Sequence, residues 1–133
     1  MAQRGMLSDI TTSALAKGLD GAYARQLAIS DNLANVETPN YQAKSVSFEA
    51  SLRAALRAER SASGTGHDGG RIEDVRPYVR RSATMWRRDG NSVNIETEMV
   101  QMAKTSLHYR MLSRLMAKKF RMMARILNGG GGQ

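Results

Sequence analysis

Apolar residues recur at heptad spacing in the first quarter of the chain. Between residues 8 and 36 they follow alternating steps of four and three, with Gln26 filling one slot. This spacing predicts a helix with a single apolar seam. Pro39 cannot continue a helix and also restricts the residue before it, so the helix should end near Asn35. The apolar positions are Leu15, Leu19, Ala22, Ile29, Leu33 and Val36.

The same alternation returns in the last third of the chain and is longer there. From Ile95 it continues without a break for more than four heptads, which predicts a second, long helix. Asn94 can cap the start of this helix, and Asn128 with Gly129 supplies a stop. At 1.5 Å per residue the helix is on the order of 50 Å long, too long for a compact chain of this size. Its stripe is Ile95, Met99, Met102, Ser106, Tyr109, Ser113, Met116, Phe120, Met123 and Leu127.

The two stripes together predict the fold class. We expect an all-α, elongated protein in which the N- and C-terminal helices pair as a coiled-coil-like hairpin around an irregular or partly extended middle. The large apolar members of the two stripes form a candidate assembly seam. They are Leu15, Leu19, Ile29, Leu33, Ile95, Met99, Met102, Tyr109, Met116, Phe120, Met123 and Leu127.

The remaining segments are shorter and more irregular. Thr38-Pro39-Asn40 carries turn chemistry, and a short alternating stretch around Val46 precedes a modest helix over residues 48–60. We therefore expect four units along the chain. They are residues 1–56 with the N-terminal helix, turn and short second helix; residues 57–88 as a flexible or extended insertion rich in Arg and Gly; residues 89–128 with the long helix; and residues 129–133 as a mobile tail.

Composition limits how large a core this chain can build. Leu, Ile, Val and Phe number 24 of 133 residues, about 18%, and the net charge is +8. That combination is typical of chains that do not fold alone, so we expect the isolated monomer to be poorly structured. Cysteine is absent, which excludes disulfides and thiolate chemistry. We expect neither a membrane span nor a secretory signal, because no run of apolar residues is long enough for either.

The chain offers no persuasive catalytic, cofactor or metal site. His67 lies beside Asp68 in a Gly-rich stretch, where a solvated loop is the simpler interpretation. His108 has no second His or carboxylate at ligand spacing on the long helix. Gly64-Thr65-Gly66 is not followed by the Lys-Ser/Thr of a phosphate loop. We therefore expect no enzymatic activity, no cofactor, no metal and no small-molecule substrate.

The charges are unevenly distributed. Residues 101–133 carry seven Lys and Arg and no acid, so nucleic acid, anionic membranes and acidic protein faces are the partner classes to consider. Five cations fall within about 80° of the long helix, and three Asp recur every eleven residues on the first helix. We interpret them as ribbons that meet between neighbouring chains; a basic face toward solvent or a central channel is an equal alternative. The ribbons are Asp9, Asp20 and Asp31, and Arg110, Arg114, Lys118, Arg121 and Arg125.

Two segments are more specific than composition. Residues 31–41, DNLANVETPNY, resemble the signature of the bacterial flagellar rod and hook proteins, in which an Asn-rich helix end runs into Ala-Asn-x-x-Thr-Pro-Gly-Tyr. Asn40 stands where Gly is commoner, and Asn is the next best residue for left-handed backbone. Residues 89–99, DGNSVNIETEM, resemble the family's second signature, which precedes its terminal helix. The residues of the first signature are Asn32, Ala34, Asn35, Thr38, Pro39 and Tyr41.

The resemblance is strongest to the short proximal rod member of that family. It implies a structural subunit that is exported without a cleaved signal by the flagellar export apparatus. In the periplasm such subunits assemble into the helical, hollow axial drive shaft of the flagellar basal body, which transmits torque and passes exported subunits. The implied partners are further copies of the chain, other rod subunits, the small rod adaptor at the rod base and the membrane ring, with no nucleic acid. The rival interpretation is a basic helical nucleic-acid-binding protein, whose binding would weaken steeply with salt.

Overall fold

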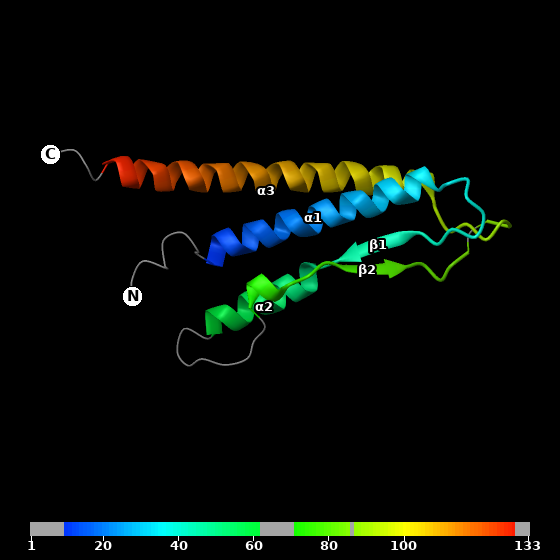
Figure 1. Cartoon of the computed structure of the whole chain (residues 1–133), viewed down its shortest axis with the longest axis horizontal. Coiled ribbons are helices and arrows are strands. Elements are labelled where there is room, and N and C mark those ends of the chain that lie inside the picture. Colours follow the sequence, from blue (N-terminus) through cyan, green and yellow to red (C-terminus); the bar gives the residue numbers. More distant parts are fainter. Residues whose placement is uncertain (1–9, 62–70, 86, 130–133) are drawn as a thin grey trace.

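The protein is elongated and has three layers (Figure 1). The computed structural model describes residues 10–61, 71–85 and 87–129. Helix α3 forms one outer layer, α1 lies alongside it as the middle layer, and two strands with helix α2 form the other outer layer. The elements are α1 (Ile10–Ala34), β1 (Lys44–Ser47), α2 (Glu49–Ser61), the 3-10 turn η1 (Ile72–Asp74), β2 (Tyr78–Arg81) and α3 (Ile95–Gly129). Asp9, His67, the glycines at 64–70 and the tail residues 130–133 lie outside the described residues.

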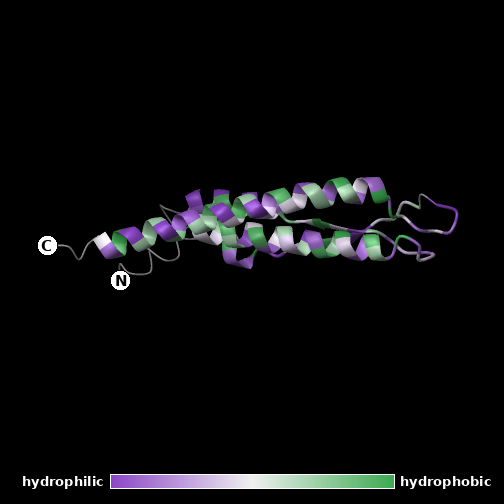
Figure 2. Ribbon diagram, turned by 90° about the horizontal axis from the view of Figure 1, so that it is seen from above, coloured by the Kyte–Doolittle hydropathy of each residue, from purple (hydrophilic) through white to green (hydrophobic). Residues whose placement is uncertain are grey.

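The two long helices lie where the periodicity predicts them. α1 ends at Ala34, before the turn that contains Pro39, and α3 begins at Ile95. Asn94 caps α3, because its Oδ1 accepts a hydrogen bond from the Thr97 N–H at 3.1 Å. These helices and the N-cap are confirmed. α1 and α3 run in opposite directions, and hydrophobic and hydrophilic segments alternate along both of them (Figures 1 and 2). None of the described helices is both long and apolar enough to cross a membrane.

The middle of the chain is more ordered than its composition suggests. β1 and β2 form an antiparallel pair in which Val46 lies opposite Val79, so the chain is mostly helical rather than all-α. α2 spans Glu49–Ser61, in agreement with the helix predicted over residues 48–60. Ile72 is fully buried, although it falls in the segment 57–88 that was expected to be flexible or extended. Local periodicity does not reveal this order, because the strand pairing and the burial of Ile72 depend on contacts with distant residues.

The hydrophobic core is small and lies between α1, β1 and α2. Arg25 of α1 closes one side of it: its Nη2 donates to the Val46 carbonyl at 2.9 Å, and its guanidinium lies 5.2 Å from the Phe48 ring centroid. Arg25 also forms an ion pair with Glu49 at the start of α2. The core consists of two clusters, Ala28, Val46 and Phe48, and Ala55, Ile72 and Val75, which Leu52 joins.

The face of α3 that lies against α1 differs in part from the predicted stripe. Thr105 is the buried residue of α3, and Leu112 contacts Gly18 of α1, although neither belongs to the stripe. A strict heptad drifts by about 20° per repeat around a straight helix, so its first members rotate away from the contact. Counting along the antiparallel helices from Gly18 and Leu112 places Ile10 opposite residue 120, so the last turns of α3 extend past the described part of α1.

The individual seam residues follow this geometry. On α1, Ile29 is buried, and the other seam residues, Leu15, Leu19 and Leu33, are half-buried. On α3, the half-buried members are Met102, Met116 and Met123. The exposed members are Ile95 at 50%, Met99 at 58%, Tyr109 at 38%, Phe120 at 52% and Leu127 at 72%.

Two glycines of α1 lie where its neighbours approach closely. A Cβ at Gly18 would lie 3.2 Å from Leu112 Cδ1, which is a mobile methyl group at the end of a side chain. A Cβ at Gly21 would overlap the ring of Phe48, which is buried in the core. Gly21 is therefore required by packing, whereas Gly18 is required less strictly.

These two glycines should respond differently to the same substitution. Gly21→Ala should destabilise the chain by roughly 2 kcal/mol, because overpacking against Phe48 outweighs the gain in helix propensity of about 1 kcal/mol. Gly18→Ala, the matched control, gains the same propensity and should be nearly neutral. Urea midpoints of the two variants, read by circular dichroism on the assembled protein at equal chain concentration, make the comparison. Equal midpoints for the two variants would contradict this account of the packing.

Candidate functional site

The first signature segment forms a tight turn directly after α1. The Thr38 N–H donates to the Asn35 carbonyl at 3.0 Å, and the Tyr41 N–H donates to the Thr38 carbonyl at 3.3 Å. Asn40 has a φ of +59°, in the left-handed region. The prediction that Asn40 replaces glycine in a left-handed position is thereby confirmed, since Asn tolerates this conformation better than most residues.

The second signature segment inserts the side chain of Asn91 into this turn. Asn91 is fully buried, and its Nδ2 lies 2.9 Å from the Asn35 carbonyl, 3.1 Å from that of Val36 and 2.7 Å from that of Thr38. Its Oδ1 accepts from the Val93 N–H at 2.7 Å. One buried amide thus contacts three carbonyls of the turn that follows α1.

Backbone contacts join the same two segments. The Asn40 N–H donates to the Asp89 carbonyl at 2.9 Å, and the Ser92 N–H donates to the Tyr41 carbonyl at 3.0 Å. Gly90 has a φ of +78°, and a Cβ there would overlap Oδ1 of Asn40. The two left-handed residues therefore pack against each other. We call this contact of residues 35–41 with residues 87–92 the clasp.

Arg87 adds a charged contact at the rim of the clasp. Its Nη1 donates to the Val36 carbonyl at 2.9 Å and lies 3.6 Å from the Glu37 carboxylate. Its Nη2 lies 3.4 Å from Asp89. These groups are partly or largely exposed, so their ion pairs contribute little stability individually. The Val36 carbonyl thus accepts from both Arg87 and Asn91.

A second buried amide, that of Asn32, fastens the last turn of α1 to β1. Its Nδ2 donates to the Lys44 carbonyl at 2.7 Å, while its Oδ1 accepts from the Lys44 N–H at 2.8 Å and from the Tyr41 hydroxyl at 3.3 Å. Desolvation by burial raises the pKa of Tyr41, so its hydroxyl stays protonated and can donate. Asn32 therefore acts as an extra strand residue that pairs with β1.

The other signature residues have smaller roles in this region. The Thr38 hydroxyl donates to Oδ1 of Asn35 at 3.1 Å, and Nδ2 of Asn35 donates back to the Asp31 carbonyl at 2.8 Å. Ala34 and Pro39 are exposed at the end of α1 and in the turn. The signature is thus largely a set of residues that close the end of α1 and receive the second segment.

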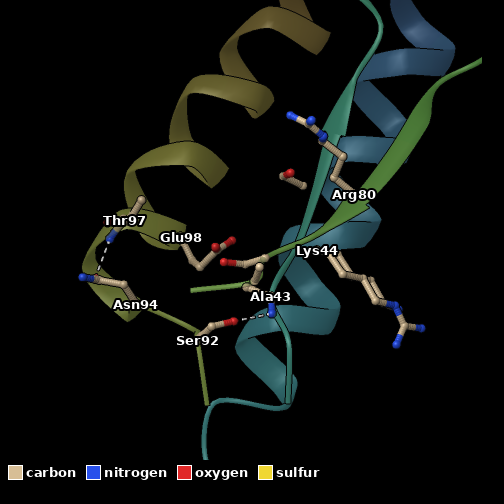
Figure 3. Close-up of a pocket in the computed structure, with 11 residues that line it drawn as sticks. Ala43, Lys44, Arg80, Ser92, Asn94, Thr97 and Glu98 are labelled. Carbon is tan, nitrogen blue, oxygen red and sulfur yellow. Dashed lines mark hydrogen bonds between the residues drawn. The ribbon is translucent and has the colours of Figure 1, made fainter. Parts of the chain in front are cut away.

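A pocket of about 590 Å³ lies beside the clasp, between the two strands and the first turn of α3 (Figure 3). Cations of the strands, Lys44 and Arg80, line it together with Glu98 of α3. At its lower edge, Ser92 Oγ accepts from the Ala43 N–H at 2.7 Å. Desolvation by burial raises the pKa of Glu98, and a hydrogen bond with Asn32 lowers it by less. With Arg81 also in the lining, the pocket carries three cations and one carboxyl group.

The described residues supply little for catalysis or metal binding. No group of three His, Asp or Glu side chains that could hold a metal ion is found among residues 10–61, 71–85 and 87–129. His108 is exposed on α3. The polar groups buried in the clasp have hydrogen-bond partners and serve to hold the backbone. The arrangement can therefore join two segments of chain.

The described members of the predicted charged ribbons are exposed on the long helices. Asp31 pairs with Lys44 at 2.8 Å, and this contact raises the pKa of Lys44. Asp20 lies 3.9 Å from Lys17. Within the part of the chain that the structure describes, no ion pair joins the cations of the α3 ribbon to an acid. Those exposed cations are Arg110, Arg114, Lys118, Arg121 and Arg125.

Sequence reasoning assigned no role to the side chains that make the clasp specific. Asn91, Ser92 and Arg87 lie in or beside the second signature, but a pattern of residue types does not reveal that one amide reaches carbonyls more than fifty positions away. The available signal was the Asp-Gly-Asn sequence before a helix, since Gly and Asn are the residues that tolerate left-handed backbone.

These features define a structural protein whose N- and C-terminal helices are fastened together at one end. No model of a known protein family matches the chain. Individual proteins do: the chain is 32% identical to the flagellar basal body rod protein FlgB of Bacillus subtilis over 122 residues, 90% of this chain and 95% of that protein. It is 33% identical to FlgB of Borrelia hermsii, over 77% of this chain and 84% of the relative. It is 28% identical to FlgB of Salmonella typhimurium, over 80% of this chain and 84% of that relative.

The chain therefore belongs to the family of the flagellar basal body rod protein FlgB. As a member of that family it is a structural subunit of the rod, and it belongs in the flagellar basal body.

Removing the Asn91 amide should destabilise the clasp strongly. Asn91→Ala removes the amide that donates to the turn and leaves the buried Val93 N–H without its acceptor, so it should lower the free energy of unfolding by about 3 kcal/mol. Asn91→Asp keeps the shape but replaces the donor by an acceptor, so it should be at least as harmful. Asn128→Ala, at an exposed position near the end of α3, is the control and should be nearly neutral. Urea unfolding of the assembled protein, at equal chain concentration, measures the stability of all three variants. An Asn91→Ala midpoint equal to that of the control would refute the role of the clasp.

Glu98 should make stability depend on pH in a defined direction. Its pKa in the folded chain lies above the ordinary 4.5, so ionisation is harder in the folded than in the unfolded state. Glu98→Gln removes this penalty and should raise the urea midpoint of the assembled protein at pH 7. The advantage should shrink as the pH falls through the raised pKa and vanish well below 4.5, where the carboxyl is protonated in both states. An advantage of the Gln variant that persists at low pH would show that it has another cause.

Proposed function

We propose that this chain is a subunit of the proximal rod, where it assembles with copies of itself and with other rod subunits into a helical, hollow drive shaft that transmits torque and passes exported subunits. Membership of the FlgB family over 90% of the chain is the observation that carries this proposal. The clasp supports it, because a shaft that carries torque needs subunits whose two terminal helices cannot separate. A short polar fastening with a buried amide resists such separation.

The apolar seam is the proposed basis of assembly. The α1–α3 contact leaves Ile95, Met99 and Leu127 at least half exposed, and a free chain gains nothing from apolar groups in water. In the assembled rod these residues would be covered by neighbouring subunits, while α1 and α3 pack as a coiled-coil-like hairpin. Burial against neighbours would also supply the core that the chain's composition does not provide.

The charged ribbons are proposed to guide that assembly. Exposed cations that pair with no acid among the described residues can attract the acidic ribbon of a neighbouring chain, Asp9, Asp20 and Asp31, and so set orientation and rate more than affinity. Asp20 and Asp31 also contact lysines of their own chain. Their attraction to a neighbouring chain therefore competes with these contacts. The alternative, a basic face toward solvent or the channel, predicts no effect of these charges on assembly.

The chain would be exported without a cleaved signal by the flagellar export apparatus and assemble in the periplasm. There it would contact the small rod adaptor at the rod base and the membrane ring. It would need no cofactor, metal, nucleic acid or small-molecule substrate. The reported relatives lend no support to the nucleic-acid-binding alternative.

Reversing charges on the basic ribbon should block assembly without unfolding the chain. Arg114→Glu with Lys118→Glu should greatly reduce the amount of the chain in isolated basal bodies and impair motility, because several weak pairs turn repulsive together. Arg53→Glu with Arg57→Glu is the matched control, since these arginines are also exposed and one helical turn apart, on α2. Equal incorporation of both double variants, measured by immunoblot, would favour the solvent-facing alternative.

A further inference from the structure

α3 carries a second apolar stripe on the side that does not contact α1. At 100° per residue its members fall within about 80° of the helix circumference, well away from Thr105 and Met116. Their exposure is 59% for Leu107, 53% for Met111, 51% for Leu115 and 54% for Met122. The outer stripe of α3 is Leu107, Met111, Leu115, Lys118 and Met122, with the basic ribbon along one edge.

α1 also has a side that no described element covers. α1 contacts α3 through Gly18. It contacts the layer formed by the strands and α2 through Gly21 and Arg25. The third side carries two large exposed apolar residues, Tyr23 at 56% and Leu27 at 50%. The outer stripe of α1 is Ala16, Asp20, Tyr23, Leu27 and Asp31, all of them exposed and within about 80° of one another.

The two outer stripes match in spacing and in charge. Read forward, the α1 stripe has steps of 4, 3, 4 and 4; read backward, the α3 stripe has the same steps. Aligned in this way, Tyr23 lies opposite Leu115, Leu27 opposite Met111 and Asp20 opposite Lys118. Ala16 meets Met122, a small residue against a large one, and Asp31 meets Leu107 beside Arg110. Apolar groups therefore face apolar groups, and acids face or adjoin cations.

The two stripes cannot meet within one chain, because each points away from the α1–α3 contact. We propose that the outer stripe of α1 on one copy packs antiparallel against the outer stripe of α3 on a second copy, in the register that puts Leu27 opposite Met111. This proposal rests on the proposed assembly into a rod and names the surface used. Copies that point in the same direction make this contact antiparallel, since α1 and α3 run in opposite directions within each copy (Figure 1).

The geometry of the contact has a consequence for assembly. Each copy presents one stripe of each kind on different sides, so the contact is heterologous and every pairing leaves a free stripe at either end. Such a contact adds subunits in series rather than closing into a two-fold dimer. The acidic and basic residues exclude the like pairings, because α1 against α1 or α3 against α3 would oppose equal charges.

Cysteine cross-linking in rods tests this contact directly, because the chain contains no cysteine. Leu27→Cys with Met111→Cys, in basal bodies from cells expressing the double variant, should give disulfide-linked dimers and higher multimers after mild oxidation. Tyr23→Cys with Leu115→Cys is a second pair in the same register, should the first disturb folding. Tyr23→Cys with Leu107→Cys is the matched control: it uses the same stripes but lies eight residues, about 12 Å, out of register, too far for a disulfide.

The outcomes separate this proposal from the proposed function. Multimers from the first two pairs and only monomer from the control support the stripe-to-stripe contact. Monomer from all three pairs, with the variants present in the basal body, overturns the contact and leaves the rod function standing. Multimers from the control pair alone would show that the stripes meet in a different register, which overturns the proposal. Absence of the unmodified chain from isolated basal bodies would instead count against the rod function itself.

Discussion

The buried amide of Asn91 is the interaction on which the arrangement of this chain depends. By donating toward carbonyls at the end of α1, it fixes where the segment before α3 can run. From that point α3 must return along α1, and Leu112 then lies against Gly18. Asn32 makes the corresponding link to β1. The three layers are therefore joined to one another by buried amides near the end of α1. A polar fastening suits this task because its geometry admits one arrangement, whereas apolar contacts tolerate sliding.

Away from the clasp the chain has little to hold it together. The core comprises small clusters around Phe48 and Ile72, and α3 buries Thr105 alone among its described residues. Much of the apolar surface of α3 is left for other molecules to cover. Folding and assembly are therefore expected to be coupled, with the clasp setting the geometry of the subunit and neighbours supplying the missing burial.

Much of this could be predicted from the sequence, for reasons that are local. The periodicity around Leu19 and Met116 located both long helices, the Asn94 cap marked the start of α3, and the chemistry of Asn40 indicated left-handed backbone. The clasp could not be predicted in the same way. Asn91 and Asn35 are 56 positions apart, and nothing in their identities indicates that they meet. The strand pairing of Val46 with Val79 and the burial of Ile72 were missed for the same reason. The outer stripe of α3 could not be recognised from the sequence. Lys118 interrupts it and the basic ribbon borders it, so it resembles an ordinary solvated face.

Hydrogen exchange of individual backbone amides tests the central claim most directly. The Asn40, Ser92 and Val93 N–H groups all donate to residues of the clasp, so their exchange reports its opening. If the clasp holds the subunit together, these three amides should exchange together and more slowly than amides in the last turns of α3, around Leu127. If they exchange as fast as that end of the helix, the two terminal segments are held by something other than the clasp, and this account of the fold is wrong.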